Sequence, residues 1–128
     1  MDPVFRALQA NRPVLVVGLH PATTPTPIRD ARGWAMARSA PFRAPHWSCS
    51  LRALEGVESR PGELELAGEG LLVLSDAHEF TFAALRSVAI NRWSSRAGRR
   101  TRIVAIVPSL DAARKVRAAC PIRWSIVQ

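Results

Sequence analysis

The sequence of residues 70–80, GLLVLSDAHEF, decides how the rest of the chain is interpreted. Its apolar residues run directly into Ser75-Asp76, and Glu79 follows three positions later. A short, wholly apolar run is typical of a strand that is buried on both faces of a parallel sheet. The stretch therefore predicts a buried strand whose carboxyl end presents acidic residues at an edge of the sheet, where ligands bind in such folds.

Two further apolar runs resemble this strand, and short helices are expected between them. Val14–Val17 ends at Gly18, and Ile103–Val107 ends at Pro108, while residues 123–128, RWSIVQ, predict a fourth strand. Periodicity and capping residues predict helices over residues 3–10, 28–38, 50–54, 63–67 and 79–90 and after Ser109, and Pro61-Gly62 predicts a turn. The alternation predicts a three-layer α/β fold, with a parallel sheet of about four strands between helices, in a single domain over residues 1–128.

Composition narrows the class of protein. A chain of 128 residues with 48% hydrophobic and 22% charged residues can bury a core. It has no apolar run near the roughly 20 residues that a membrane span needs, and its first residues do not resemble a secretory signal. We therefore expect a cytoplasmic protein without a membrane partner, in which Cys49 and Cys120 are reduced and buried.

The net charge of +8 is unevenly distributed. Seven of the ten acidic residues lie between Glu55 and Glu79, whereas the segment from Arg86 to Arg102 holds six arginines and no acid. Such a segment is either a solvated surface or a contact for nucleic acid or for an acidic protein face. The candidate contact residues are Arg92, Trp93, Arg96, Arg99, Arg100 and Arg102.

Two segments of the chain carry a family resemblance. Residues 40–47, APFRAPHW, and 60–80, RPGELELAGEGLLVLSDAHEF, resemble the segments RPFRAPHH and PGEISLAHxGVLFLDELPEF of the magnesium chelatase ATPase subunit and its bacterial chelatase-like relatives. That family is AAA+, so the resemblance implies a P-loop NTPase-like core with a nucleotide site at the sheet edge. The remnant of that site would comprise Gly18, Thr23, Thr24, Ser75, Asp76 and Glu79.

The sequence departs from this family where the family binds ATP. A phosphate-binding loop needs GxxxxGK[ST], but residues 18–25 read GLHPATTP, and the only lysine of the chain is Lys115. Ser75 replaces the acid that the resemblance would assign to magnesium, and Asp76 stands where the family has glutamate. The last predicted strand reaches the end of the sequence, so we expect the family's helical lid to be missing. We expect a degenerate, truncated member that is not an enzyme, with no metal site, and ATP and Mg²⁺ are disfavoured as cofactors.

Three functions remain open at this point. The favoured one is a non-catalytic scaffold or regulatory subunit that binds a protein partner, either a related AAA+ ATPase or a second copy of the chain. In that case Arg123, in the segment that resembles the family's DRFD-like motif, would act on a neighbour's phosphates. The alternatives are a nucleic-acid-binding module that uses the Arg86–Arg102 segment and a residual ATPase with an unorthodox site.

Two smaller clusters have a chemical and a structural interpretation. Asp76, His78 and Glu79 could bind a metal together with His20 or His46, but the sequence has no metal-ligand spacing such as HxxxH. His46 with Ser48 or Cys49 suggests a base and a nucleophile. The structural interpretation of the second cluster is a buried Cys49 beside a helix cap at Ser50.

Overall fold

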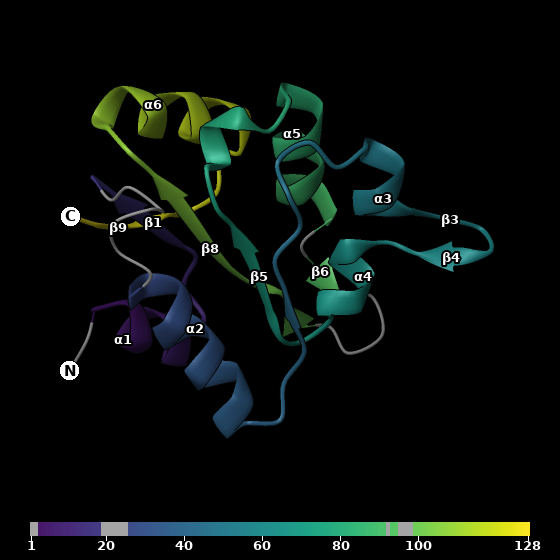
Figure 1. Cartoon of the computed structure of the whole chain (residues 1–128), viewed down its shortest axis with the longest axis horizontal. Helices are drawn as coiled ribbons and strands as arrows, with labels where there is room; N and C mark the ends of the chain where they lie inside the picture. The colour runs from purple at the N-terminus through teal and green to yellow at the C-terminus, as the bar shows by residue number, and fades with distance from the viewer. Residues whose placement is uncertain (1–2, 19–25, 92, 95–98) are drawn as a thin grey trace.

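The computed structural model describes residues 3–18, 26–91, 93–94 and 99–128. A parallel five-stranded sheet lies at its centre, with the strand order β2-β5-β8-β1-β9 (Figure 1). The strands are β1 (Val14–Val17), β2 (Phe42–Arg43), β5 (Leu71–Leu74), β8 (Arg102–Val107) and β9 (Ser125–Val127). The predicted three-layer α/β fold is therefore confirmed.

Helices cover both faces of this sheet, which explains why its strands are apolar on both sides. Val14 and Val16 of β1 face α1 (Pro3–Gln9) and α2 (Thr26–Ala37), whereas Leu15 and Val17 belong to a second core cluster on the opposite face. That second cluster includes residues of α3 (Leu51–Glu55), α4 (Glu63–Ala67), α5 (Phe82–Asn91) and α6 (Leu110–Ala119). In Figure 1, α1 and α2 lie below the sheet, and α5 and α6 lie above it.

Two short antiparallel hairpins complete the described part of the chain. The first pairs β3 (Gly56–Val57) with β4 (Arg60–Pro61), and it projects from the body of the molecule between α3 and α4 (Figure 1). The second pairs β6 (Trp93–Ser94) with β7 (Arg99–Arg100) immediately before β8.

The structure adds a fifth strand to the four that we predicted. Strand β2 contains only Phe42 and Arg43, between Pro41 and Pro45, so its apolar pattern is too short to identify it. It pairs with β5, and the N–H of Leu71 donates to the carbonyl of Pro41 at 2.9 Å. The prediction of a turn at Pro61-Gly62 was also wrong. The chain reverses at residues 58–59, and Pro61 is the last residue of β4.

The helix predicted from Glu79 begins later than expected. Residues Ala77–Glu79 form a separate 3₁₀ turn, η1, and α5 begins at Phe82. The hydroxyl of Thr81 accepts a hydrogen bond from the N–H of Ala84 at 3.1 Å and so caps the helix. Phe82, the first residue of α5, is 59% exposed, whereas Phe80 is buried.

Other local predictions are confirmed. Ser50 caps α3 by accepting from the N–H of Ala53 at 3.0 Å, and Ser109 caps α6 by accepting from the N–H of Ala112 at 3.2 Å. Cys120 is buried as predicted, whereas Cys49 is only half-buried. No helix among the described residues is both long enough and apolar enough to cross a membrane.

Candidate functional site at the carboxyl edge of the sheet

The predicted nucleotide-site remnant lies where three neighbouring strands end. In the sheet β8 lies between β5 and β1, so Gly18, Ser75 and Pro108 follow adjacent parallel strands at one edge. The N–H of Gly18 donates to the carbonyl of Val107 at 3.0 Å, which joins the ends of β1 and β8. The helix after β1 covers one face of the sheet and the helix after β8 covers the other. This is the arrangement that creates a ligand crevice in α/β folds.

Ser75 and Asp76 continue from β5 into this edge, and both are half-buried. Asp76 has a left-handed backbone with φ 51°, a conformation that aspartate tolerates better than most residues. Its carbonyl accepts from the N–H of Glu79 at 2.9 Å, which closes η1. The turn therefore fixes the backbone of Asp76, the first acidic residue after the strand.

Glu79 and His78 interact with each other beside this turn. The Nε2 atom of His78 lies 3.2 Å from Oε1 of Glu79, whose side chain is 50% exposed. The Nδ1 atom of His78 is buried without a hydrogen-bond partner among the described residues. The Glu79 carboxylate therefore contacts the His78 ring at the surface of the turn.

Sequence reasoning placed the chain's only lysine away from this site, but α6 brings it close. The Nζ atom of Lys115 donates to the carbonyl of His78 at 2.7 Å. The two residues are 37 positions apart, and no sequence pattern links them. The ammonium group thus lies against the backbone that follows β5, on the face of the sheet that α5 and α6 cover.

The two smaller clusters, the possible metal site and the possible base and nucleophile at His46, differ in whether their residues come together. Among the described residues, no three histidine, cysteine, aspartate or glutamate side chains come together as a metal site. His20, Thr23 and Thr24 lie outside the described residues. His46 does meet Ser48, because its Nδ1 atom is 2.7 Å from the serine hydroxyl, but both side chains are exposed. In the described part of the chain no acid hydrogen-bonds this histidine, so a catalytic triad is not assembled.

The arginine-rich segment forms the β6–β7 hairpin, with Trp93 opposite Arg100 and Ser94 opposite Arg99 in the backbone register. Arg92 and Arg96 lie outside the described residues. Arg102, the first residue of β8, lies against the helices of one face of the sheet. Its Nε atom donates to the carbonyl of Leu8 at 2.8 Å, and its guanidinium lies 4.7 Å from the ring centre of Trp34. The Arg102 guanidinium therefore packs between β8 and the layer that α1 and α2 form.

Arg123 is exposed at the end of the sheet opposite to Gly18. It precedes β9, and the pairing of Ser125 with Val14 places this end beside the start of β1. The distance along the strands separates Arg123 from the candidate nucleotide edge of its own chain. Any action of this residue on phosphates would therefore require a second subunit.

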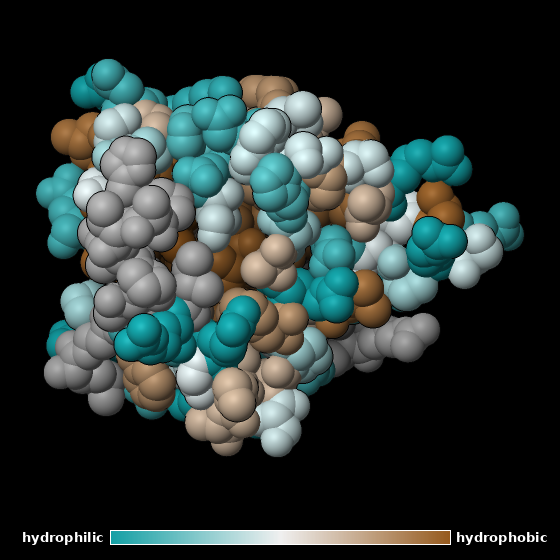
Figure 2. All heavy atoms as spheres, viewed as in Figure 1, coloured by the Kyte–Doolittle hydropathy of each residue, from teal (hydrophilic) through white to brown (hydrophobic). Residues whose placement is uncertain are grey.

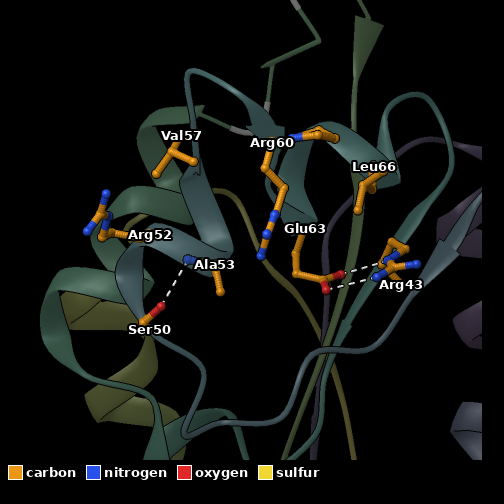
Figure 3. A pocket seen from close by; sticks show the side chains of 9 residues that line it. Arg43, Ser50, Arg52, Ala53, Val57, Arg60, Glu63 and Leu66 are labelled. Carbon is orange, nitrogen blue, oxygen red and sulfur yellow. Dashed lines mark hydrogen bonds and ion pairs between the residues drawn. The ribbon is translucent and has the colours of Figure 1, made fainter.

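Sequence reasoning did not find a cleft that lies between α3, the β3–β4 hairpin and α4. Its volume is about 550 Å³, and it is lined by Arg43, Ser50, Arg52, Ala53, Val57, Arg60, Pro61, Glu63 and Leu66 (Figure 3). We call it the hairpin cleft. The individual arginines were visible in the sequence, but only the fold of the hairpin against two short helices brings them together.

Glu63 affects the pKa values of two neighbouring side chains, Arg43 and Cys49. It pairs with Arg43, and its hydrogen bond raises the pKa of the Arg43 guanidinium. The pKa of the Cys49 thiol is also raised, mainly by burial and secondly by the negative charge of Glu63. A thiol with a raised pKa is a poorer nucleophile at neutral pH, which disfavours Cys49 as a catalytic group.

Comparison with known proteins now identifies the family. The sequence model described as magnesium chelatase, subunit ChlI, matches residues 26–90, which is half of the chain. The chain belongs to this family. The matched part contains both β2 and β5, and it begins after the GLHPATTP segment that departs from a phosphate-binding loop. No curated protein sequence matches the chain.

Solved structures confirm the P-loop NTPase fold of this ChlI-family chain. NtrX from Brucella abortus in complex with ADP matches with a TM-score of 0.70 at 16% identity, over 98% of this chain and 33% of NtrX. NtrX in complex with ATP matches with a TM-score of 0.67 at 17% identity, over 97% and 35%. The P-loop NTPase domain of an E. coli sigma-54 transport activator matches with a TM-score of 0.55 at 16% identity, over 95% and 89%. The chain thus spans about a third of the length of the NtrX chains.

Proposed function

We propose that this ChlI-family domain does not hydrolyse ATP and acts instead as a binding or regulatory subunit for a related AAA+ ATPase. The observation that carries the proposal is the end of β5, where Ser75 stands at the position of the family's metal-binding acid. A serine hydroxyl is neutral at physiological pH and contributes much less than a carboxylate to binding Mg²⁺. The single acid that follows it, Asp76, sits in a tight turn.

The described residues at this edge fit Mg²⁺-ATP poorly. Triphosphate binding in P-loop proteins relies on a lysine and on glycines that let backbone N–H groups close around the phosphates. Here the only lysine donates to the carbonyl of His78, and the sequence GLHPATTP lacks the lysine and the second glycine of the motif. Prolines at 21 and 25 each remove a backbone N–H donor. These features support a domain that depends on a partner for nucleotide chemistry.

Arg123 suggests how such a subunit would act on its partner. It is exposed, and it lies at the end of the sheet away from its own nucleotide edge. An arginine supplied by one subunit to the phosphates of the next stabilises the charge of phosphoryl transfer. The proposed partner is therefore an ATPase with an intact phosphate loop, and the proposed contact is between its nucleotide and Arg123.

The test uses the full chain with a purified ChlI-family ATPase that has an intact phosphate loop. We expect no ATP hydrolysis by the chain alone and a higher ATPase rate of the partner in the mixture. Arg123→Ala should abolish that increase, whereas Arg117→Ala, an exposed arginine at the end of α6, should retain it. Measured binding of both variants to the partner separates loss of activation from loss of docking. ATP turnover by the isolated chain, or full activation by Arg123→Ala, would contradict the proposal.

A second function, nucleic-acid binding, is favoured by the position of the arginine-rich segment. In the β6–β7 hairpin, Trp93 and Arg100 lie opposite each other in the backbone register. Arginine can contact phosphates and tryptophan can stack on bases. This function predicts oligonucleotide binding that weakens steeply with salt, and a gel shift without binding at low salt would exclude it.

A further inference from the structure

The base of the hairpin cleft is closely packed. Gly56 and Gly62 form the base of the β3–β4 hairpin, and a Cβ atom added at Gly62 would meet the backbone N of Gly56 at 2.3 Å and the carbonyl of Leu54 at 2.4 Å. The hairpin base is thus packed directly onto the end of α3 and the start of α4. Close packing at the base limits the conformational entropy that the hairpin can lose when a ligand binds.

The charges that line this cleft are not balanced internally. Glu63 is the one acid in the lining, and Arg43 already occupies both of its carboxylate oxygens. No carboxylate of the described residues pairs with Arg52 or Arg60. Figure 3 shows Arg60 extending from the hairpin into the space beside Glu63, while Arg52 lies at the α3 rim. The lining therefore carries a net charge of +2 that favours an anionic group.

Apolar side chains lie beside these arginines. Val57 on the hairpin is 39% exposed and Leu66 on α4 is 41% exposed, and both line the cleft. Figure 2 shows hydrophilic and hydrophobic residues next to one another at this projecting end of the molecule. Covering such side chains removes apolar surface from water, which stabilises a complex in addition to any ion pair.

We propose that the hairpin cleft binds a short acidic peptide segment of a protein partner. One carboxylate of the segment pairs with Arg60, the charge of Arg52 supports it from the rim, and a neighbouring apolar side chain packs against Val57 and Leu66. Arg43 and Glu63 form the floor of the cleft, and their ion pair stays intact when the peptide binds. This inference does not depend on Arg123 or on an ATPase partner.

A peptide fits the cleft better than nucleic acid does. A phosphate backbone is a regular array of charges, and proteins usually contact it with several cations and polar groups along a groove. Here Arg60 extends inward, Arg52 lies at the rim, and the aliphatic side chains of Val57 and Leu66 are also part of the lining. Aliphatic side chains do not provide the flat aromatic surface on which bases stack. Nucleic-acid binding in the cleft is the competing outcome of the test.

The first experiment selects peptides from a displayed library of random twelve-residue sequences. The target is the full chain, and a double variant, Arg52→Gln with Arg60→Gln, is used for counter-selection. We expect enriched peptides to combine aspartate or glutamate with leucine, isoleucine or phenylalanine, and to be lost on the double variant. The proposal is overturned if no sequences are enriched, if the enriched ones lack an acid, or if the double variant retains them.

The second experiment measures the affinity of the most enriched peptide by fluorescence anisotropy. We expect Arg60→Gln to weaken binding at least about tenfold and Leu66→Ala several-fold, since a charged hydrogen bond and a packed apolar side chain are both removed. Arg117→Gln, an equal charge loss on α6, should leave the affinity unchanged. Thermal melting of each variant checks its folding.

An equal loss of affinity in Arg60→Gln and Arg117→Gln would reduce the effect to general charge and overturn the proposal. A twenty-nucleotide single-stranded oligonucleotide is measured in parallel on the same variants. If Arg60→Gln weakens the oligonucleotide and not the peptide, the cleft is a nucleic-acid contact and the peptide proposal is wrong. If it weakens the peptide alone, the cleft is the peptide site that we propose.

Discussion

Arg43 and Glu63 form a two-point ion pair that joins the edge strand of the sheet to a helix. The Nε atom of Arg43 lies 2.7 Å from Oε2 of Glu63, and its Nη2 atom lies 2.9 Å from Oε1. Arg43 belongs to β2, and Glu63 begins α4. These residues come from the PFRAPH and PGE segments that carry the family resemblance. The structure thus gives a physical reason for the two segments to occur together.

Breaking this pair should weaken the attachment of β2. We expect Arg43→Ala to lower the free energy of unfolding by about 1 kcal/mol, because a bidentate pair with side chains 41% and 21% exposed is only partly screened. Arg43→Lys should recover only part of this loss, since an ammonium group cannot form both hydrogen bonds. Urea unfolding of the single variants and of Arg43→Ala with Glu63→Ala measures the coupling energy. A coupling energy near zero would show that the pair contributes nothing to stability.

Two glycines should respond in opposite ways to the same substitution. A Cβ atom at Gly62 would meet three backbone atoms within 2.5 Å, whereas a Cβ atom at Gly33 in α2 would meet nothing within 4 Å. We expect Gly62→Ala to destabilise the protein by at least about 2 kcal/mol through overpacking. We expect Gly33→Ala to stabilise it by up to about 1 kcal/mol, because alanine is the better helix former.

Thermal melting of both glycine variants checks this prediction, and each serves as the control for the other. Equal melting temperatures for the two would mean that the base of the hairpin is not packed as closely as the structure shows. A loss of stability in Gly62→Ala alone would support the close packing at the base of the hairpin cleft.

Alkylation should report the raised pKa of Cys49. Cys120 is fully buried and Cys49 is half-buried, so iodoacetamide should modify Cys49 first in the folded protein. The thiolate is the reactive form, so a raised pKa moves the midpoint of the rate–pH profile above that of a free thiol. Glu63→Gln should move the midpoint downward in part, because burial, the larger cause, remains. A Cys49 midpoint below that of a free thiol would contradict the prediction, and Cys120→Ala should leave the profile unchanged.

The strands of the core could be predicted because both of their faces are buried. Leu71–Leu74 and Ile103–Val107 are continuous apolar runs, and short runs of this kind are typical of strands that lie between two layers of helices. Capping residues such as Ser50 and Ser109 act locally, so the sequence also indicated where α3 and α6 begin. The family resemblance then supplied the fold in which these elements are arranged.

Features that depend on distant contacts could not be predicted. The two-residue strand β2 exists because Gly70 and Leu71 pack and pair with it, and a Cβ atom at Gly70 would meet the carbonyl of Pro41 at 2.0 Å. Phe82 is aromatic and yet exposed, because Thr81 caps α5 immediately before it and Phe80 fills the core instead. The contact of Lys115 with His78 and the grouping of arginines in the hairpin cleft likewise arise only when the helices are in place.

The position of Arg102 leads to a last prediction, which separates stability from binding in the arginine-rich segment. Its guanidinium donates to the carbonyl of Leu8 and lies over Trp34, which is itself 2% exposed. Arg102→Ala would leave a backbone acceptor without this donor and remove a cation–π contact, so we expect a loss of about 2 kcal/mol and a lower melting temperature. Arg99→Ala, in the β6–β7 hairpin, is the matched control, and we expect it to change stability by less than about 0.5 kcal/mol.

Urea unfolding and the salt dependence of oligonucleotide binding are measured on both variants. If the segment binds nucleic acid, Arg99→Ala should lower the affinity while Arg102→Ala changes it little under conditions where the variant is folded. A stable Arg102→Ala protein with weakened oligonucleotide binding would show instead that Arg102 is a contact residue.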